Sequence, residues 1–145
     1  MRNLLLIVMV NIFLMPSASA RDTVASYSVV QALSLEQTKS ALGSDIRFYF
    51  GDQEHRSVVK NFGEFRSNNK TNAFGKSDKV ACQWVFLSAM IVLRNQAIRE
   101  GGNAVIDIKS NYRNKLTSSN NSFQCGAGNF VAGVALVGTV VALEK

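Results

Sequence analysis

The sequence has few of the residues from which catalytic and metal sites are built. Its 145 residues include one histidine, His55, and ten dispersed acidic residues. The carboxylates near His55 belong to Asp52 and Glu54, whereas a closed metal site usually draws its ligands from separated elements. Paired carboxylates at helical or strand spacing, as general acid–base chemistry requires, are also missing. We therefore expect no metal, no cofactor and no catalytic residue.

Nucleotide and hydrolase motifs are incomplete or missing. Gly75-Lys76-Ser77 matches the end of a phosphate-binding loop, but Lys70 stands where the first glycine is required, and no apolar strand precedes it. No Gly-x-Ser-x-Gly element exists to present a nucleophilic serine. These gaps favour a non-catalytic protein, and the alternative is an enzyme that acts on an envelope component and uses His55.

Charge of one sign is in excess, but it is not clustered. The chain has 16 basic residues and a net charge of +6, and its lysines and arginines are scattered singly. Runs of five or more basic residues, which mark nucleic-acid-binding tails, are missing, so we expect no nucleic-acid partner. The anionic surfaces that an exported basic protein meets are lipid head groups, lipopolysaccharide and wall polymers.

Long apolar runs are limited to the N-terminus. Leu4 to Met15 follows Arg2 and is too short to span a bilayer permanently, which is typical of a signal peptide. Ala18 and Ala20 supply small residues for signal peptidase and predict a mature N-terminus at Arg21. Removal of residues 1–20 would lower the net charge to +5. We expect a periplasmic or secreted protein with no transmembrane segment in the mature chain.

The two cysteines, Cys82 and Cys125, predict a disulfide. An even number of cysteines in an exported chain favours a bond, because the compartment is oxidising. Their spacing is not the Cys-x-x-Cys of redox-active pairs, so we expect a structural role. Closing this 44-residue loop would stabilise the fold by about 4 kcal/mol in the chain-entropy model.

Hydrophobic patterning predicts an α+β domain over residues 21–145. We expect a short helix that begins in a capping box at Ser34, and a long core helix from Val80 to Ile98 that buries Trp84. Gly133 and Gly138 favour a strand rather than a helix near the C-terminus. A small antiparallel or mixed sheet should pack on the long helix. The predicted strands cover residues 24–30, 46–50, 103–109, 123–125 and 130–143.

Residues 51–77 are polar and rich in asparagine, which predicts a long loop pinned by its few Phe and Val side chains. The exposed basic and aromatic residues of this loop are our candidates for binding a partner. They are His55, Arg56, Lys60, Phe62, Phe65, Arg66, Lys70, Phe74 and Lys76.

Several short motifs are shared with known families. They are Phe48-Tyr49-Phe50-Gly51, Lys70 to Asp78, Ala81-Cys82-x-Trp84, Gly102-Asn103-Ala104-Val105, Cys125-x-x-Gly128 and Gly133-Val134-Ala135-Leu136. Through them the chain resembles, over nearly the whole mature chain, a family of small exported proteobacterial proteins of unknown function, often labelled excinuclease ATPase subunits. More distantly it resembles RcsF-type envelope stress sensors and YbjQ-type small domains, although it lacks the lipidated cysteine, proline-rich linker and additional disulfide of the RcsF type.

These observations together predict a disulfide-tied binding or envelope-sensing module with a macromolecular or envelope-surface partner. A third alternative is self-assembly through the glycine-punctuated final strand, which would make the protein a homo-oligomer.

Overall fold

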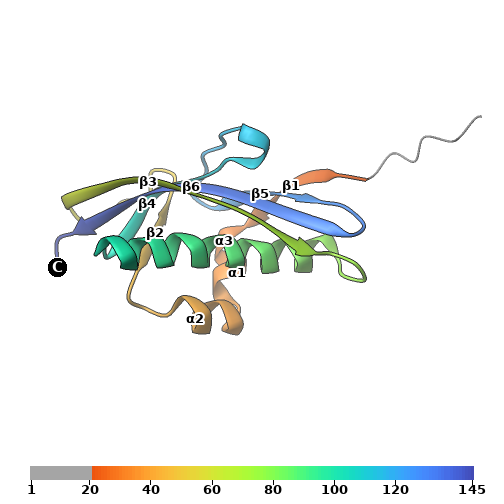
Figure 1. Ribbon diagram of the computed structural model, residues 1–145, viewed down its shortest axis with the longest axis horizontal. Coiled ribbons are helices and arrows are strands. Elements are labelled where there is room, and N and C mark those ends of the chain that lie inside the picture. Colours follow the sequence, from red (N-terminus) through yellow and green to blue (C-terminus); the bar gives the residue numbers. More distant parts are fainter. Residues whose placement is uncertain (1–20) are drawn as a thin grey trace, which may run out of the picture.

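The computed structural model describes residues 21–145 and combines one mixed sheet with a long helix, which confirms the α+β prediction (Figure 1). The predicted signal peptide, including Ala18 and Ala20, lies outside the described residues. The elements are β1 Thr23–Ser28, α1 Val29–Ser34, α2 Glu36–Leu42, β2 Arg47–Phe50, β3 Val58–Asn72, α3 Asp78–Glu100, β4 Ala104–Ser110, the 3₁₀ turn η1 Tyr112–Asn114, β5 Ser122–Ala127 and β6 Val131–Leu143.

The final strand, β6, forms the centre of the sheet. Along one edge β3 pairs antiparallel with it, from Val58 opposite Leu143 to Asn72 opposite Val131. The other edge is shared by β4 and β5, both antiparallel. Outside these two, β1 pairs with β5, and β2 runs parallel to β4. Both edges of β6 are therefore occupied, which leaves this strand no free edge on which a second copy could add.

The long helix α3 supplies most of the core. Ser77 caps its start by accepting a hydrogen bond from the backbone N–H of Val80 at 3.2 Å, and Gly101 ends it in the left-handed conformation. Phe86 stacks on Phe123 of β5 with 4.1 Å between ring centroids. Buried residues recur every four positions along the helix, at Ala81, Val85, Ala89, Leu93 and Ala97.

The prediction that Trp84 is buried is wrong. The residue is 46% exposed, and Val80 and Ile98 on the same side of α3 are 42% and 46% exposed. Leu87 and Ile91, which lie between them on that side, are buried and half-buried, so only the two ends of the stripe face solvent. The helix is apolar on nearly every side, so its sequence has no polar face to show which stripe packs inward.

The predicted long loop over residues 51–77 is also wrong, because most of it is the strand β3. Its register with β6 shifts between Val58 and Lys60 and again between Asn61 and Gly63. These irregularities break the alternation by which a strand is recognised in sequence. Such a polar strand is suited to the edge of a sheet, where charged side chains discourage further pairing.

The two short helices lie on the side of α3 away from the sheet and form a third layer (Figure 1). Arg94 links α3 to this layer, because its Nε donates a 2.7 Å hydrogen bond to the carbonyl oxygen of Leu42 at the end of α2. The predicted capping box is wrong. Ser34 is the last residue of α1, and α2 begins after Leu35, whose backbone is extended.

Candidate functional site

The nine predicted partner-binding residues do not form one cluster. They follow β3 and its flanking connections, so His55 and Arg56 lie before one end of the strand, while Phe74 and Lys76 lie beyond the other. Fifteen residues at about 3.3 Å each separate these ends by about 50 Å. The set therefore divides into two terminal groups and a middle group.

The middle group belongs largely to the body of the fold. Phe62 and Phe65 are partly buried and pack against the hydrophobic core. Lys60 lies over the Phe62 ring at 4.9 Å, and Arg66 pairs with Glu64 at 3.6 Å. These aromatic side chains stabilise the contact between β3 and α3, which leaves little apolar surface here for a partner.

The group at His55 lies beside a polar hollow of about 380 Å³ near the C-terminus, lined by Tyr49 and Arg56 among others. The imidazole Nδ1 lies 2.8 Å from the carbonyl oxygen of Arg56, and the ring meets Tyr49 edge-on. Among the hydrogen bonds of residues 21–145, none joins His55 to Ser, Asp or Glu. Within the same residues no three His, Cys, Asp or Glu side chains gather where a metal ion could bind.

The group at Phe74 forms a distinct surface together with residues from two other segments. Phe74, in the turn between β3 and α3, stacks on Phe130, in the turn between β5 and β6, with rings 5.7 Å apart and nearly parallel. The two rings are 67% and 66% exposed, and Val131 beside them is 50% exposed. We call Phe74, Phe130, Val131, Lys76 and Arg21 the aromatic tip.

The turns that carry the two phenylalanines are fixed to each other through the backbone. The N–H of Ala73 donates to the carbonyl oxygen of Phe130 at 2.8 Å, and the N–H of Gly128 donates to that of Val131 at 2.8 Å. Asn72 also accepts a hydrogen bond from the N–H of Phe74 through its side chain, at 2.8 Å. Both exposed rings are therefore held in place before any partner binds.

Arg21 joins this end of the sheet to the start of α3. Its guanidinium forms a two-pronged ion pair with Asp78, at 2.8 and 2.9 Å, and also donates to the carbonyl oxygen of Gly128 and to the side chain of Asn129. Hydrogen bonding to Arg21 holds the pKa of Asp78 below its ordinary value, since it stabilises the carboxylate. A hollow of about 280 Å³ opens between Arg21, Asn129, Phe130 and Val131.

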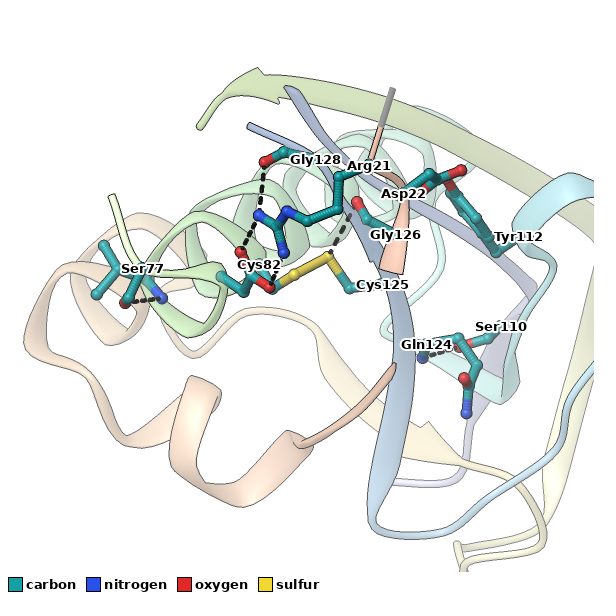
Figure 2. The surroundings of a disulfide bond; sticks show 12 residues. Arg21, Asp22, Ser77, Cys82, Ser110, Tyr112, Gln124, Cys125, Gly126 and Gly128 are labelled. Carbon is teal, nitrogen blue, oxygen red and sulfur yellow. Dashed lines mark hydrogen bonds and ion pairs between the residues drawn. A yellow bond between two sulfur atoms is a disulfide. The ribbon is translucent and has the colours of Figure 1, made fainter. Parts of the chain in front are cut away.

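The predicted disulfide is confirmed, and it supports the aromatic tip. Cys82, one turn after Asp78 on α3, is bonded to Cys125 of β5, with 5.9 Å between their Cα atoms. Both cysteines are fully buried. Figure 2 shows the bond at the same end of the molecule as Arg21 and Gly128. The cross-link thus holds the start of α3 to the strand that leads into the Phe130 turn.

Positive charge is in excess around the aromatic tip. The carboxylates of Asp22 and Asp78 are paired with Arg113 and Arg21. Lys70, Lys76 and Lys79 are exposed and form no ion pair with any residue in the part of the chain that the structure describes. Three cations without ion-pair partners therefore lie within five residues of Phe74 along the chain.

No protein-family model, curated protein or solved structure matches this chain. The resemblance to small exported proteobacterial proteins therefore stays a prediction. None of the helices within residues 21–145 combines the length and the apolar character needed to cross a membrane.

Sequence reasoning identified Phe74 and Lys76 but missed three members of the aromatic tip. Phe130 and Val131 were assigned to the start of the final strand, and Arg21 was noted only as the new N-terminus. A usable signal was present in Gly128-Asn129-Phe130, where a large apolar residue follows two typical turn residues. This motif indicates that the Phe130 ring is exposed, but it does not indicate that the ring stacks on Phe74.

Proposed function

We propose that this protein is an exported, non-catalytic binding module of the cell envelope, and that it engages its partner through the aromatic tip. The observation that carries the proposal is the stacked and largely exposed pair Phe74 and Phe130. Single exposed apolar residues are ordinary, whereas clustered apolar side chains with a polar surround mark interaction sites.

Rigidity supports a binding role for this surface. Ordering flexible side chains and loops on association reduces affinity, so a surface that is already fixed binds more tightly. A backbone hydrogen bond between the two turns, from Ala73 to Phe130, provides that fixation together with the Arg21–Asp78 pair and the Cys82–Cys125 bond. Aromatic residues that bury large areas are also the commonest energetic centres of protein interfaces.

The buried disulfide supports an exported location. Disulfides persist in oxidising compartments and are rare in the reducing cytosol. A structural bond between Cys82 and Cys125 therefore fits the predicted signal peptide and a periplasmic or secreted destination.

Site-specific photo-cross-linking in intact cells tests this function. A photoreactive residue at position 130 or 74 should give discrete cross-linked products. The same residue at Val59, which is 68% exposed at the opposite end of β3, is the matched control and should give far less. Equal yields at positions 59 and 130, or none at position 130, would show that the aromatic tip is not the binding surface.

A further inference from the structure

We infer that the partner of the aromatic tip is the anionic surface of a phospholipid bilayer, with Phe74 and Phe130 entering the interface and nearby lysines contacting the head groups. This inference rests on the proposed function and names its partner. Three features of this end of the molecule carry it: the chemistry of the exposed side chains, the surplus of positive charge, and the position of Arg21.

The exposed side chains of the aromatic tip have the chemistry of interfacial anchors. Phe74 and Phe130 present their rings from two turns at the end of the sheet, and Val131 adjoins them. Phenylalanine on the apolar side and lysine or arginine on the polar side is the composition by which peripheral proteins lie in a membrane interface. Because the Phe74 and Phe130 rings are both exposed at the same end of the sheet, both can enter a planar lipid surface together.

Charge complementarity favours an anionic surface. Lys70, Lys76 and Lys79 lie within five residues of Phe74 and have no ion-pair partners among residues 21–145, while the carboxylates of Asp22 and Asp78 are neutralised by arginines. A cation held close to an anionic leaflet strengthens binding about fivefold. Three such cations add electrostatic attraction to the burial of two apolar rings, and these are the two contributions that set the strength of binding at a membrane interface.

The described part of the chain begins at this same end. Arg21, where the described residues begin, donates a hydrogen bond to the carbonyl oxygen of Gly128 (Figure 2). It donates another to the side chain of Asn129, next to Phe130. The apolar run that ends at Met15 is six residues away, and six residues span at most about 20 Å. While that run is held in a bilayer, the aromatic tip therefore lies within reach of the lipid surface. The predicted cleavage would leave the α-amino group of Arg21 as one more positive charge there.

Vesicle co-sedimentation of the exported protein tests the inference. We expect at least tenfold stronger binding to vesicles of phosphatidylglycerol mixed with phosphatidylethanolamine than to vesicles of phosphatidylcholine, and weaker binding to the anionic vesicles at 0.5 M salt, which screens the charges. The double variants Phe74→Ser/Phe130→Ser and Lys76→Glu/Lys79→Glu should each lose at least tenfold in binding to the anionic vesicles. The control Val59→Ser/Leu116→Ser removes two other exposed apolar side chains and should bind like the wild type.

Two results would overturn the inference: equal wild-type binding to both vesicle types, or unchanged binding by the Phe74→Ser/Phe130→Ser variant. Unfolding curves of each variant separate loss of the surface from loss of the fold. If vesicle binding fails while cross-links from position 130 to a protein or a wall polymer persist in cells, the lipid partner is wrong and the proposed function stands. If cross-linking fails as well, both are wrong.

Discussion

Two aromatic residues on α3 show how position on a helix decides a residue's role. Phe86 is fully buried and lies in the stack with Phe123. Trp84, two residues earlier, points to the opposite side and is about half exposed. Residues two apart on a helix never share a face. Phe86 and Trp84 therefore have different surroundings, although both look like core residues in the sequence.

Substitution by alanine should separate these two roles. We expect Phe86→Ala to lower the free energy of unfolding by about 3–5 kcal/mol, as for a buried aromatic residue, and Trp84→Ala to lower it by about 1–2 kcal/mol, because half of the indole already faces water. Urea unfolding of both variants measures this difference. Equal losses would mean that Trp84 is buried.

The ion pair between Arg21 and Asp78 should make stability depend on pH. The pKa of Asp78 is lower in the folded protein than its ordinary value of about 3.9, so its stabilisation is complete above that value and is lost as the pH falls through the lower, folded-state pKa. At pH 7 the variant Asp78→Asn should therefore melt at a lower temperature than the wild type. The gap should close at strongly acidic pH, and a gap of the same size at pH 2 and pH 7 would contradict this explanation.

The helices and strands differ in how clearly the sequence reveals them. α3 was predicted to within two residues at each end, because Ser77 and Gly101 flank an apolar stretch. β3 was missed, because its residues facing α3 include Ser67 and Asn69 rather than an apolar series. Sequence periodicity detects a strand only when one face of the strand is apolar. An edge strand that packs against small side chains of a helix can form without such an apolar face.

The disulfide cross-links α3 to β5, and its removal should destabilise the fold. We expect Cys82→Ser and Cys125→Ser each to lower the free energy of unfolding by about 2–5 kcal/mol. The double variant should cost little more than either single variant, because both substitutions remove the same cross-link. Denaturant curves of the three variants test this, and fully additive losses would show that the two cysteines contribute separately.

At the scale of the whole molecule, the candidate site is assembled from three distant segments. Arg21, Phe74 and Phe130 meet because β1, β3, β5 and β6 all bring a terminus to the same end of the sheet (Figure 1). Strand order was not predictable from the sequence, so these residues could not be placed together. The fold class and the disulfide were predictable, since they depend on local pattern, composition and compartment.

Export should leave Arg21 as the first residue. Ala18 and Ala20 provide the small side chains that signal peptidase accepts, so intact-mass spectrometry of the exported protein should give the mass of residues 21–145. Retention of Met1 would contradict the predicted processing and would remove the extra α-amino charge from the aromatic tip.

Hydroxyl-radical footprinting of the exported protein on isolated cell envelopes tests the central claim most directly, because it surveys the exposed aromatic and aliphatic side chains of the whole molecule at once. Binding through the aromatic tip predicts that Phe74, Phe130 and Val131 become protected, while His55, Val59 and Trp84 are oxidised as readily as in the free protein. Protection at His55 and its neighbouring hollow, or along the outer face of α3 at Trp84, with the aromatic tip still reactive, would contradict it.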